Sequence, residues 1–242
     1  MPTRPLHAAW LTTQDALSVS PALALPLARL RRLRDYDGLP ITVGPDTEIV
    51  IEGYPRSGNT FAVAAFRLAQ GRPVRIAHHL HAAAQVIEGV RRGLPVVVLL
   101  REPESAVLSV AVKDPSASIR WALRSYVRFH RTVAPHRSGF VIAPFDRVRT
   151  TFGEVIRAVN DRFGTAFAEF GHTESNMAAV LESVERRGER EARATGRSLE
   201  RAVGRPSPER DRAKEALRVS YQDERHASLR QEAEALFEQL AK

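Results

Sequence analysis

Residues 53–60, GYPRSGNT, have the outer frame of a phosphate-binding loop, G-x-x-x-x-G-K-[ST], but Asn59 stands in the position of the lysine. A glycine-containing turn between a strand and a helix presents several backbone N–H groups to an anion, and the N-terminus of the helix adds partial positive charge. In nucleotide triphosphatases the lysine reaches the β- and γ-phosphates, which asparagine cannot do. Arg56 is then the cation of this loop, and its guanidinium fork suits phosphate and sulfate oxygens.

A second candidate anion site lies in residues 99–109, LLREPESAVLS. Arg101 directly follows the apolar run 94–100, and Ser109 comes eight residues later on the helix that Pro103 is suited to begin. Ligands of open α/β sheets bind at the carboxyl ends of the strands. Arg101 and the glycine loop are therefore expected to face each other across one crevice.

Both stretches resemble motifs of the sulfotransferase family. Residues 54–61, YPRSGNTF, resemble its 5′-phosphosulfate loop, which is usually Y-P-K-S-G-T-T-W, and residues 101–109 resemble its 3′-phosphate motif. The resemblance extends over roughly residues 48–165 and implies 3′-phosphoadenosine 5′-phosphosulfate (PAPS) as the donor. A sulfuryl group carries fewer charges than a phosphoryl group, so no metal is expected.

The resemblance also implies a role for each motif residue. Arg56 would contact the bridging oxygen of the donor, and Phe61 would pack on the adenine. Arg101 and Ser109 would hold the 3′-phosphate. The 5′-phosphate would be held by Ser57, Gly58, Asn59 and Thr60.

Three histidines in residues 78–81, HHLH, are candidates for the base that removes the acceptor proton. The cytosolic branch of the family has a K-T-H-L-P motif here, and alignment places His79 on its catalytic histidine, with Ala77 for the lysine and His81 for the proline. His78 is the second candidate. A structural cluster bonded to backbone is the other interpretation, while a three-histidine metal site is disfavoured because no carboxylate partner is evident.

Hydrophobic periodicity indicates which elements position these residues. Strands are expected at 48–52, 74–77, 94–100 and 139–143, and helices at 60–70, 82–92, from 103 past 109, 116–133, 152–163, 209–219 and 224–240. Their alternation predicts a three-layer α/β fold of the P-loop type, in which helices flank both faces of a parallel sheet and helices close the C-terminal part.

The chain is expected to form one domain, with a flanking segment at 1–46, a nucleotide-binding core at 47–165 and a final part at 166–242. Leucines at helical spacing predict a helix over 23–36, packed on the flank of the domain rather than on a membrane surface. Residues 171–204 are strongly charged, lack a clear apolar period and are interpreted as partly loop. The family's nucleotide clamp, R-K-G-x-x-G-x-W-K, has only faint echoes at 186–188 and 204–206.

Composition excludes several function classes. The chain has no cysteine, so disulfides, thiolate metal sites and cysteine nucleophiles are excluded. Of its 36 basic residues 33 are arginine, spread along the chain and interleaved with glutamate, so the net charge of +8 favours a pocket for a small anion over nucleic-acid binding. No apolar run is long enough to cross a bilayer and no leader segment is evident, so a cytoplasmic protein is expected. The alanine- and arginine-rich composition is typical of a GC-rich bacterial genome.

The sequence thus predicts a sulfotransferase that moves a sulfuryl group from PAPS to a hydroxyl or amine of a small-molecule acceptor. One alternative is a P-loop kinase or nucleotide triphosphatase with a relocated cation, which needs Mg²⁺ and an acidic ligand at a strand end. Neither 94–100 nor 139–143 contains an acid, though Glu102 and Asp146 lie just beyond them. The other alternative is a nucleotide-binding module without catalysis.

Overall fold

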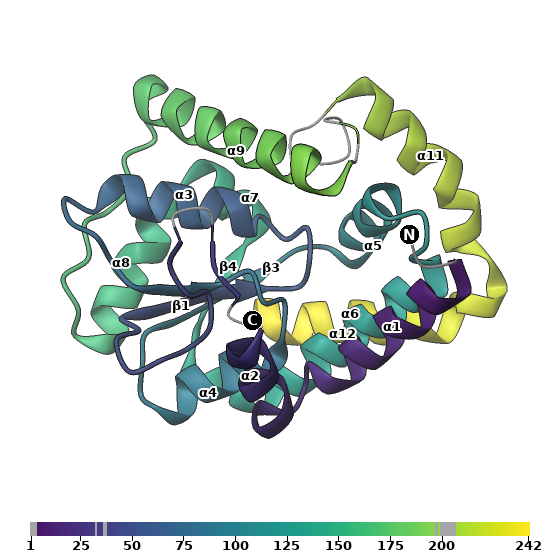
Figure 1. Ribbon diagram of the computed structural model, residues 1–242, viewed down its shortest axis with the longest axis horizontal. Helices are drawn as coiled ribbons and strands as arrows, with labels where there is room; N and C mark the ends of the chain where they lie inside the picture. The colour runs from purple at the N-terminus through teal and green to yellow at the C-terminus, as the bar shows by residue number, and fades with distance from the viewer. Residues whose placement is uncertain (1–3, 32, 36–37, 197, 199–206) are drawn as a thin grey trace.

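The computed structural model describes residues 4–31, 33–35, 38–196, 198 and 207–242. In this part of the chain four parallel strands form a sheet in the order β2-β1-β3-β4, with helices on both faces (Figure 1). The predicted α/β fold with a parallel sheet is confirmed. The strands are β1 (Ile49–Gly53), β2 (Ile76–His78), β3 (Val96–Leu100) and β4 (Val141–Pro144).

The two central strands, β1 and β3, are buried along their whole length. Helices cover both faces of a parallel sheet, so a buried strand is a nearly continuous apolar run, as VVVLL is in β3. Gly53 pairs in register with Leu99 of β3. A Cβ at Gly53 would lie 2.7 Å from the carbonyl oxygen of Leu99, so glycine allows the close approach of the two strands where the anion loop begins.

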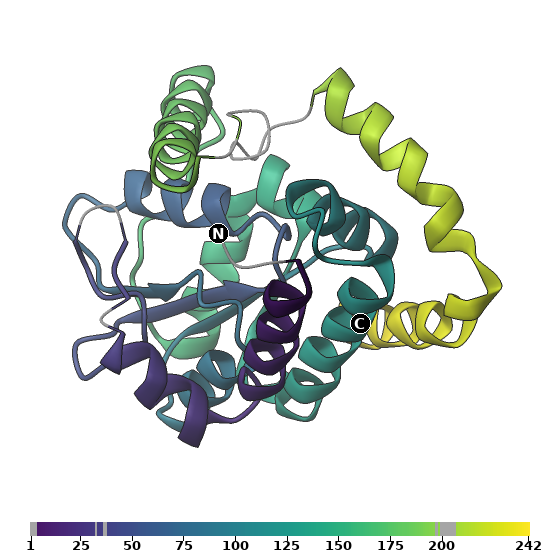
Figure 2. The ribbon, with the colours of Figure 1, turned by 45° about the vertical axis from the view of Figure 1, so that its right-hand side comes forward.

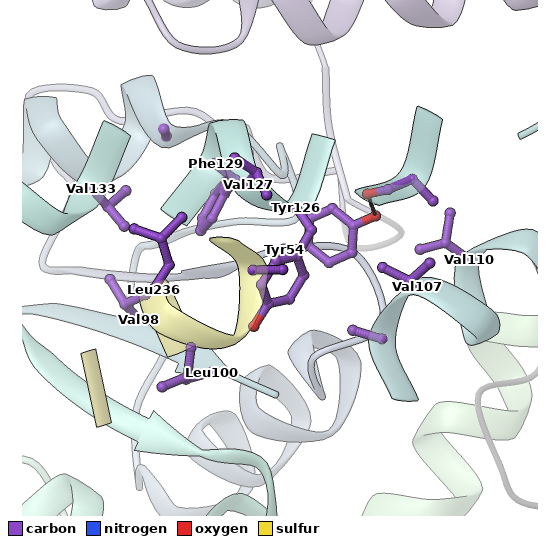
Figure 3. Close-up of a cluster of buried hydrophobic side chains, with 14 of the residues drawn as sticks. Tyr54, Val98, Leu100, Val107, Val110, Tyr126, Val127, Phe129, Val133 and Leu236 are labelled. Carbon is purple, nitrogen blue, oxygen red and sulfur yellow. Dashed lines mark hydrogen bonds between the residues drawn. The ribbon is translucent and has the colours of Figure 1, made fainter. Parts of the chain in front are cut away.

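Alternate residues of the central strands face two separate cores. Val96, Val98 and Leu100 pack with α4 (Ala83–Arg91), α5 (Pro103–Lys113), α6 (Ile119–Val133) and α12 (Ala227–Ala241). Figure 3 shows part of this core, in which Tyr54 lies beside Tyr126 of α6. Val97 and Leu99 pack with α3 (Asn59–Ala69), α8 (Phe152–Phe163) and α9 (Glu174–Thr195). The sheet is thus the middle layer of three.

The N-terminal segment forms α1 (Arg4–Leu17) and α2 (Pro21–Leu30). The helix predicted over 23–36 was misplaced, because α2 begins at Pro21, a residue favoured in the first turn, and ends at Leu30. Short elements complete the middle of the chain: η1 (Ala134–Gly139) and α7 (Phe145–Thr150). At the C-terminal end lie α11 (Pro208–Gln222) and η2 (Glu224–His226), and Figure 2 shows α11 standing out from the sheet layers.

Residues 171–204 were interpreted as partly loop, but the helix α9 occupies 22 of them. Its N-terminus is capped by Thr173, whose side chain accepts a hydrogen bond from the Asn176 N–H, and its C-terminus by Gly196, at a φ of 68°. Only Val180, Val184 and Gly188 are buried, so the apolar stripe is narrow. The echo at 204–206 lies outside the described residues.

None of the helices that the structure describes is both long enough and apolar enough to span a bilayer.

Candidate active site

The loop between β1 and α3 has a strained backbone that hydrogen bonds hold in place. Gly58 has a φ of 92° and Arg56 a φ of 71°, a left-handed conformation that costs a non-glycine residue about 1–2 kcal/mol. Such strain persists only where surrounding contacts enforce it. The Tyr54 hydroxyl donates to the Ala122 carbonyl (2.9 Å), and the Asn59 side-chain amide donates to the Tyr54 carbonyl (3.1 Å). The asparagine in the lysine position therefore braces the loop.

The two predicted phosphate-binding motifs meet directly. Arg101 Nη1 donates to the Arg56 carbonyl at 2.8 Å, and Arg56 Nε donates to Ser109 Oγ at 3.0 Å. The Tyr126 hydroxyl donates to the Arg101 carbonyl at 2.7 Å. The Arg101 guanidinium carbon also lies 4.0 Å from the ring centroid of Phe145. Arg56, Arg101 and Ser109 thus form one connected unit.

This unit lines a cavity of about 490 Å³, within the usual size range of small-molecule sites. Cationic side chains dominate its wall and come from several helices besides the two motifs. The cations are Arg56, Arg101, Lys113, Arg149, Arg187, Arg210 and Lys214, against the carboxylates Asp114 and Glu191. Four of them, Lys113, Arg149, Arg210 and Lys214, were not predicted from the sequence, and Arg187 lies in the faint echo of the nucleotide clamp at 186–188. Their charge excess favours an anionic ligand.

Burial disfavours the charged form of the arginines in this wall, and the neighbouring cations repel one another. Burial, together with the nearby charges of Arg210 and Arg101, lowers the pKa of Arg56 to about 10. Burial also lowers the pKa of Arg101. Both side chains remain cations at neutral pH, and a bound anion would relieve their repulsion.

Three buried polar atoms of the motifs lack a hydrogen-bond partner among the described residues: Ser57 Oγ, Asn59 Oδ1 and Arg101 Nε. Buried polar groups normally have partners, and unpaired ones on a cavity wall are available to a ligand. Arg101 and Asn59 line the cavity, as do Gly58, Thr60 and Phe61, whereas Ser57 is buried outside its lining. The Phe61 ring also meets the Phe170 ring edge-on, with centroids 6.4 Å apart.

A chain of side chains connects His79 to a buried carboxylate. His79 directly follows β2 with a φ of 56°, and its Nε2 lies 3.1 Å from Thr60 Oγ1. Its Nδ1 lies 2.7 Å from His78 Nδ1. His78 Nε2 is in turn 3.5 Å from Asp35 Oδ2, and this carboxylate pairs with Arg67 at 2.5 Å. The sequence analysis did not identify Asp35, which lies more than 40 residues from His79.

The members of this chain have strongly shifted pKa values. Burial lowers the pKa of His79 well below 6.5, and the guanidinium of Arg187, 3.5 Å from Nδ1, adds to that effect. Burial by itself would raise the pKa of Asp35, but hydrogen bonds with His78 and Arg67 hold it well below its usual range. At neutral pH an ionised Asp35 therefore faces neutral imidazoles.

His81 serves as a brace, in agreement with the structural interpretation of the histidine cluster. Its φ is 52°, and its Nδ1 donates to the Gly53 carbonyl at 3.0 Å. Burial lowers its pKa to about 4. Beneath it the buried Glu52 carboxyl accepts from the Leu80 N–H (2.9 Å) and the Gln85 amide (3.0 Å), and burial raises its pKa to about 8. These contacts fix the histidine segment to the end of β1.

No family model matches the chain, and no curated protein matches it. Among solved structures, the crystal structure of mouse sulfotransferase SULT7A1 complexed with PAP is similar, with 12% sequence identity and a TM-score of 0.42. The match covers 83% of this chain and 91% of the mouse protein chain. At this similarity the likeness carries no functional argument, so the function is argued from the site itself.

Proposed function

We propose that the chain is a sulfotransferase that uses PAPS as donor and a hydroxyl or amine of a small molecule as acceptor. One observation carries the proposal: Arg101 bonds to the Arg56 carbonyl, and Arg56 bonds to Ser109. The loop amides and the guanidinium after β3 therefore serve one cavity. A nucleotide that carries anionic groups on both its 5′ and 3′ positions needs such a pair of neighbouring sites.

In this proposal the family resemblance gives the roles of Arg56, Thr60, Phe61, Arg101 and Ser109. The backbone amides at the start of α3, with Thr60, hold the 5′-phosphate, and Arg56 stabilises charge on the leaving phosphate oxygen. Arg101 and Ser109 hold the 3′-phosphate, and the face of Phe61 is available to the adenine. Asn59 contributes through its bond to the Tyr54 carbonyl.

His79 acts as the base. The acceptor oxygen or nitrogen bonds to sulfur while the bond from sulfur to the 5′-phosphate oxygen breaks, and the acceptor proton passes to His79 Nε2. The guanidinium nitrogens of Arg67 and Arg187 lie 3.3 Å from His78 Nε2 and 3.5 Å from His79 Nδ1, and because they can only donate they favour the opposite tautomers. When Asp35 instead accepts the Nε2 proton of His78, the His78 Nδ1 accepts from His79 Nδ1–H. This arrangement leaves His79 Nε2 unprotonated beside Thr60, ready to take a proton.

A kinase or nucleotide triphosphatase is less well supported. The two acids beyond the strand ends, Glu102 and Asp146, are exposed, and neither lines the cavity. The side chain in the lysine position is bonded to the Tyr54 carbonyl. A nucleotide-binding module without catalysis would use the same cavity and is distinguished by experiment.

Thermal unfolding with different nucleotides tests the donor assignment. Adenosine 3′,5′-bisphosphate should raise Tm without Mg²⁺, whereas ATP with Mg²⁺ and adenosine 5′-monophosphate should have little effect. Arg101→Gln should weaken bisphosphate binding by about tenfold or more, because it removes a charge-assisted contact. Arg162→Gln is the matched control, since this arginine also stacks on a phenyl ring but does not line the cavity. A Tm rise with ATP and Mg²⁺ alone would favour the kinase.

Catalysis is tested separately from binding. His79→Gln should keep bisphosphate affinity and lose transfer of the sulfuryl group from PAPS to an acceptor. Unchanged transfer by this variant would remove His79 as the base. Bisphosphate binding with no transfer to any member of a broad acceptor panel would favour the non-catalytic module.

A further inference from the structure

A second cavity, of about 510 Å³, lies between α3 and α9, which run one above the other in Figure 1. Thr60 and Arg187 line both this cavity and the cavity of about 490 Å³ that contains Arg56 and Arg101, which we call the donor cavity. The two hollows are therefore neighbours that share a wall. The second cavity is large enough for a small organic molecule.

His79 is at the shared wall. Its Nε2 lies 3.1 Å from Thr60 Oγ1, and its Nδ1 lies 3.5 Å from Arg187 Nη1. His79 itself lines the donor cavity, so Thr60 and Arg187 lie between it and a molecule in the second cavity.

The second cavity combines an apolar surface with an excess of positive charge. Four guanidinium groups line it, those of Arg67, Arg186, Arg187 and Arg190, against the single carboxylate of Asp35. Asp35 pairs with Arg67 and its side chain is 3% exposed, so these two charges offset each other and the excess comes from the arginines of α9. Glu182 pairs with Arg186 at 2.7 Å but does not line the cavity. The apolar part of the lining consists of Val63, Ala64, Leu68, Ala179 and Val180.

We propose that this cavity binds the acceptor, and that the acceptor is an anion: a small apolar body that carries a carboxylate, sulfate or phosphate. The anionic group lies against the guanidinium groups of Arg186 and Arg190. The hydroxyl or amine extends past Thr60 to His79. This inference rests on the proposed sulfotransferase function, which it deepens by giving the chemical class of the acceptor.

Two probes of the same shape, one anionic and one neutral, show how much the negative charge contributes to binding. 4-Hydroxyphenylacetate and 4-hydroxyphenylacetamide differ in charge and scarcely in size, and their affinities are measured by calorimetry on protein saturated with adenosine 3′,5′-bisphosphate. The acid should bind about tenfold more tightly than the amide, as one charge-assisted contact would give. Arg190→Gln and Arg186→Gln should each reduce that ratio. Arg187 is left unchanged because it contacts His79.

Arg193→Gln is the matched control. This arginine lies three residues beyond Arg190 on α9, is 82% exposed and does not line the cavity, so its removal should leave the ratio unchanged. Equal binding of the two probes, tighter binding of the amide, or no binding of either would overturn the proposal. An affinity ratio of acid to amide that is unchanged in both Arg186→Gln and Arg190→Gln would also overturn the proposal.

The outcomes separate this inference from the donor assignment. If the bisphosphate raises Tm but the acid shows no preference, the inference fails and the proposed function stands. If the bisphosphate does not bind but the acid keeps a preference that depends on Arg186 and Arg190, the anion site stands and the sulfotransferase function fails.

Discussion

Arg101 is held by contacts with three separate parts of the fold. Its carbonyl accepts from Tyr126 of α6, its guanidinium donates to the Arg56 carbonyl, and its face lies against Phe145 of α7. An arginine side chain loses about 2 kcal/mol of conformational freedom when it is ordered. In this protein the Arg101 side chain loses most of its conformational entropy on folding, so little more would be lost when an anion binds.

Asp35→Asn tests the tautomer of His79. With the carboxylate gone, His78 Nε2 can instead accept from Arg67 Nη2, which lies 3.3 Å away, so His78 Nδ1–H then donates to His79. His79 should shift to its Nε2–H tautomer and sulfuryl transfer should fall by about 10- to 100-fold, as expected when a general base is lost. Long-range ¹H–¹⁵N correlation of the histidine rings measures the tautomer.

The exposed Asp46 provides the control for this variant, because Asp46→Asn makes the same chemical change away from the histidines. Bisphosphate affinity should be unchanged in both variants. A His79 ring that keeps the same protonated nitrogen in Asp35→Asn would show that Asp35 does not orient it.

At the scale of the elements, the junction of β1 and β3 positions the anion loop. Gly53→Ala should lower the free energy of unfolding by about 2–3 kcal/mol, because the new methyl group would meet the Leu99 backbone and Cβ at 2.7 and 2.8 Å. Gly164→Ala is the comparison: its φ is 66° but open space surrounds it, so only the backbone term of about 1 kcal/mol applies. Urea unfolding measures both, and equal costs would contradict the argument.

The strands and most helices could be predicted from sequence because their apolar patterns are strong. For β3 the run VVVLL is buried on both faces, and α6 carries its apolar residues on one side. Helix α9 could not be predicted in this way, because its buried stripe contains only three residues in 22. Charged pairs such as Arg186–Glu182 occupy its exposed faces and obscure the period.

The same contrast holds for the candidate site. Motif spacing was enough to bring Arg56, Arg101 and Ser109 together as predicted, because both motifs follow neighbouring parallel strands. Their roles toward a donor stay predictions. Arg187 and Arg210 line the same cavity from helices late in the chain. Only the faint echo at 186–188 pointed to Arg187, and no local pattern distinguishes Arg210 from the many arginines around it.

On the scale of the whole molecule, buried histidines make stability depend on pH. Burial lowers the pKa of His130 from 6.5 to about 4, so between these values the unfolded chain binds more protons than the native protein. The free energy of unfolding must therefore fall as the pH falls through this window. His130→Gln should remove a slope of up to about 1.4 kcal/mol per pH unit.

The test is the difference between the two proteins, measured by urea unfolding from pH 4 to 7. Glu52, whose pKa is raised to about 8, has the opposite pH dependence above its usual pKa of 4.5, but it contributes equally to both proteins and cancels. A parallel pair of stability curves would show that His130 is protonated as easily in the native protein as in the unfolded chain.

The guanidinium groups gathered around the donor cavity have a practical consequence at the bench. Arg210 is buried, and the half-buried Arg56 lies near it and near Arg101, so the ligand-free protein attracts any compact multivalent anion. If this cavity binds adenosine 3′,5′-bisphosphate as proposed, inorganic phosphate, pyrophosphate or citrate in a purification buffer should compete with it and raise its apparent Kd. Affinities measured after dialysis into a monovalent, phosphate-free buffer will be the tighter ones.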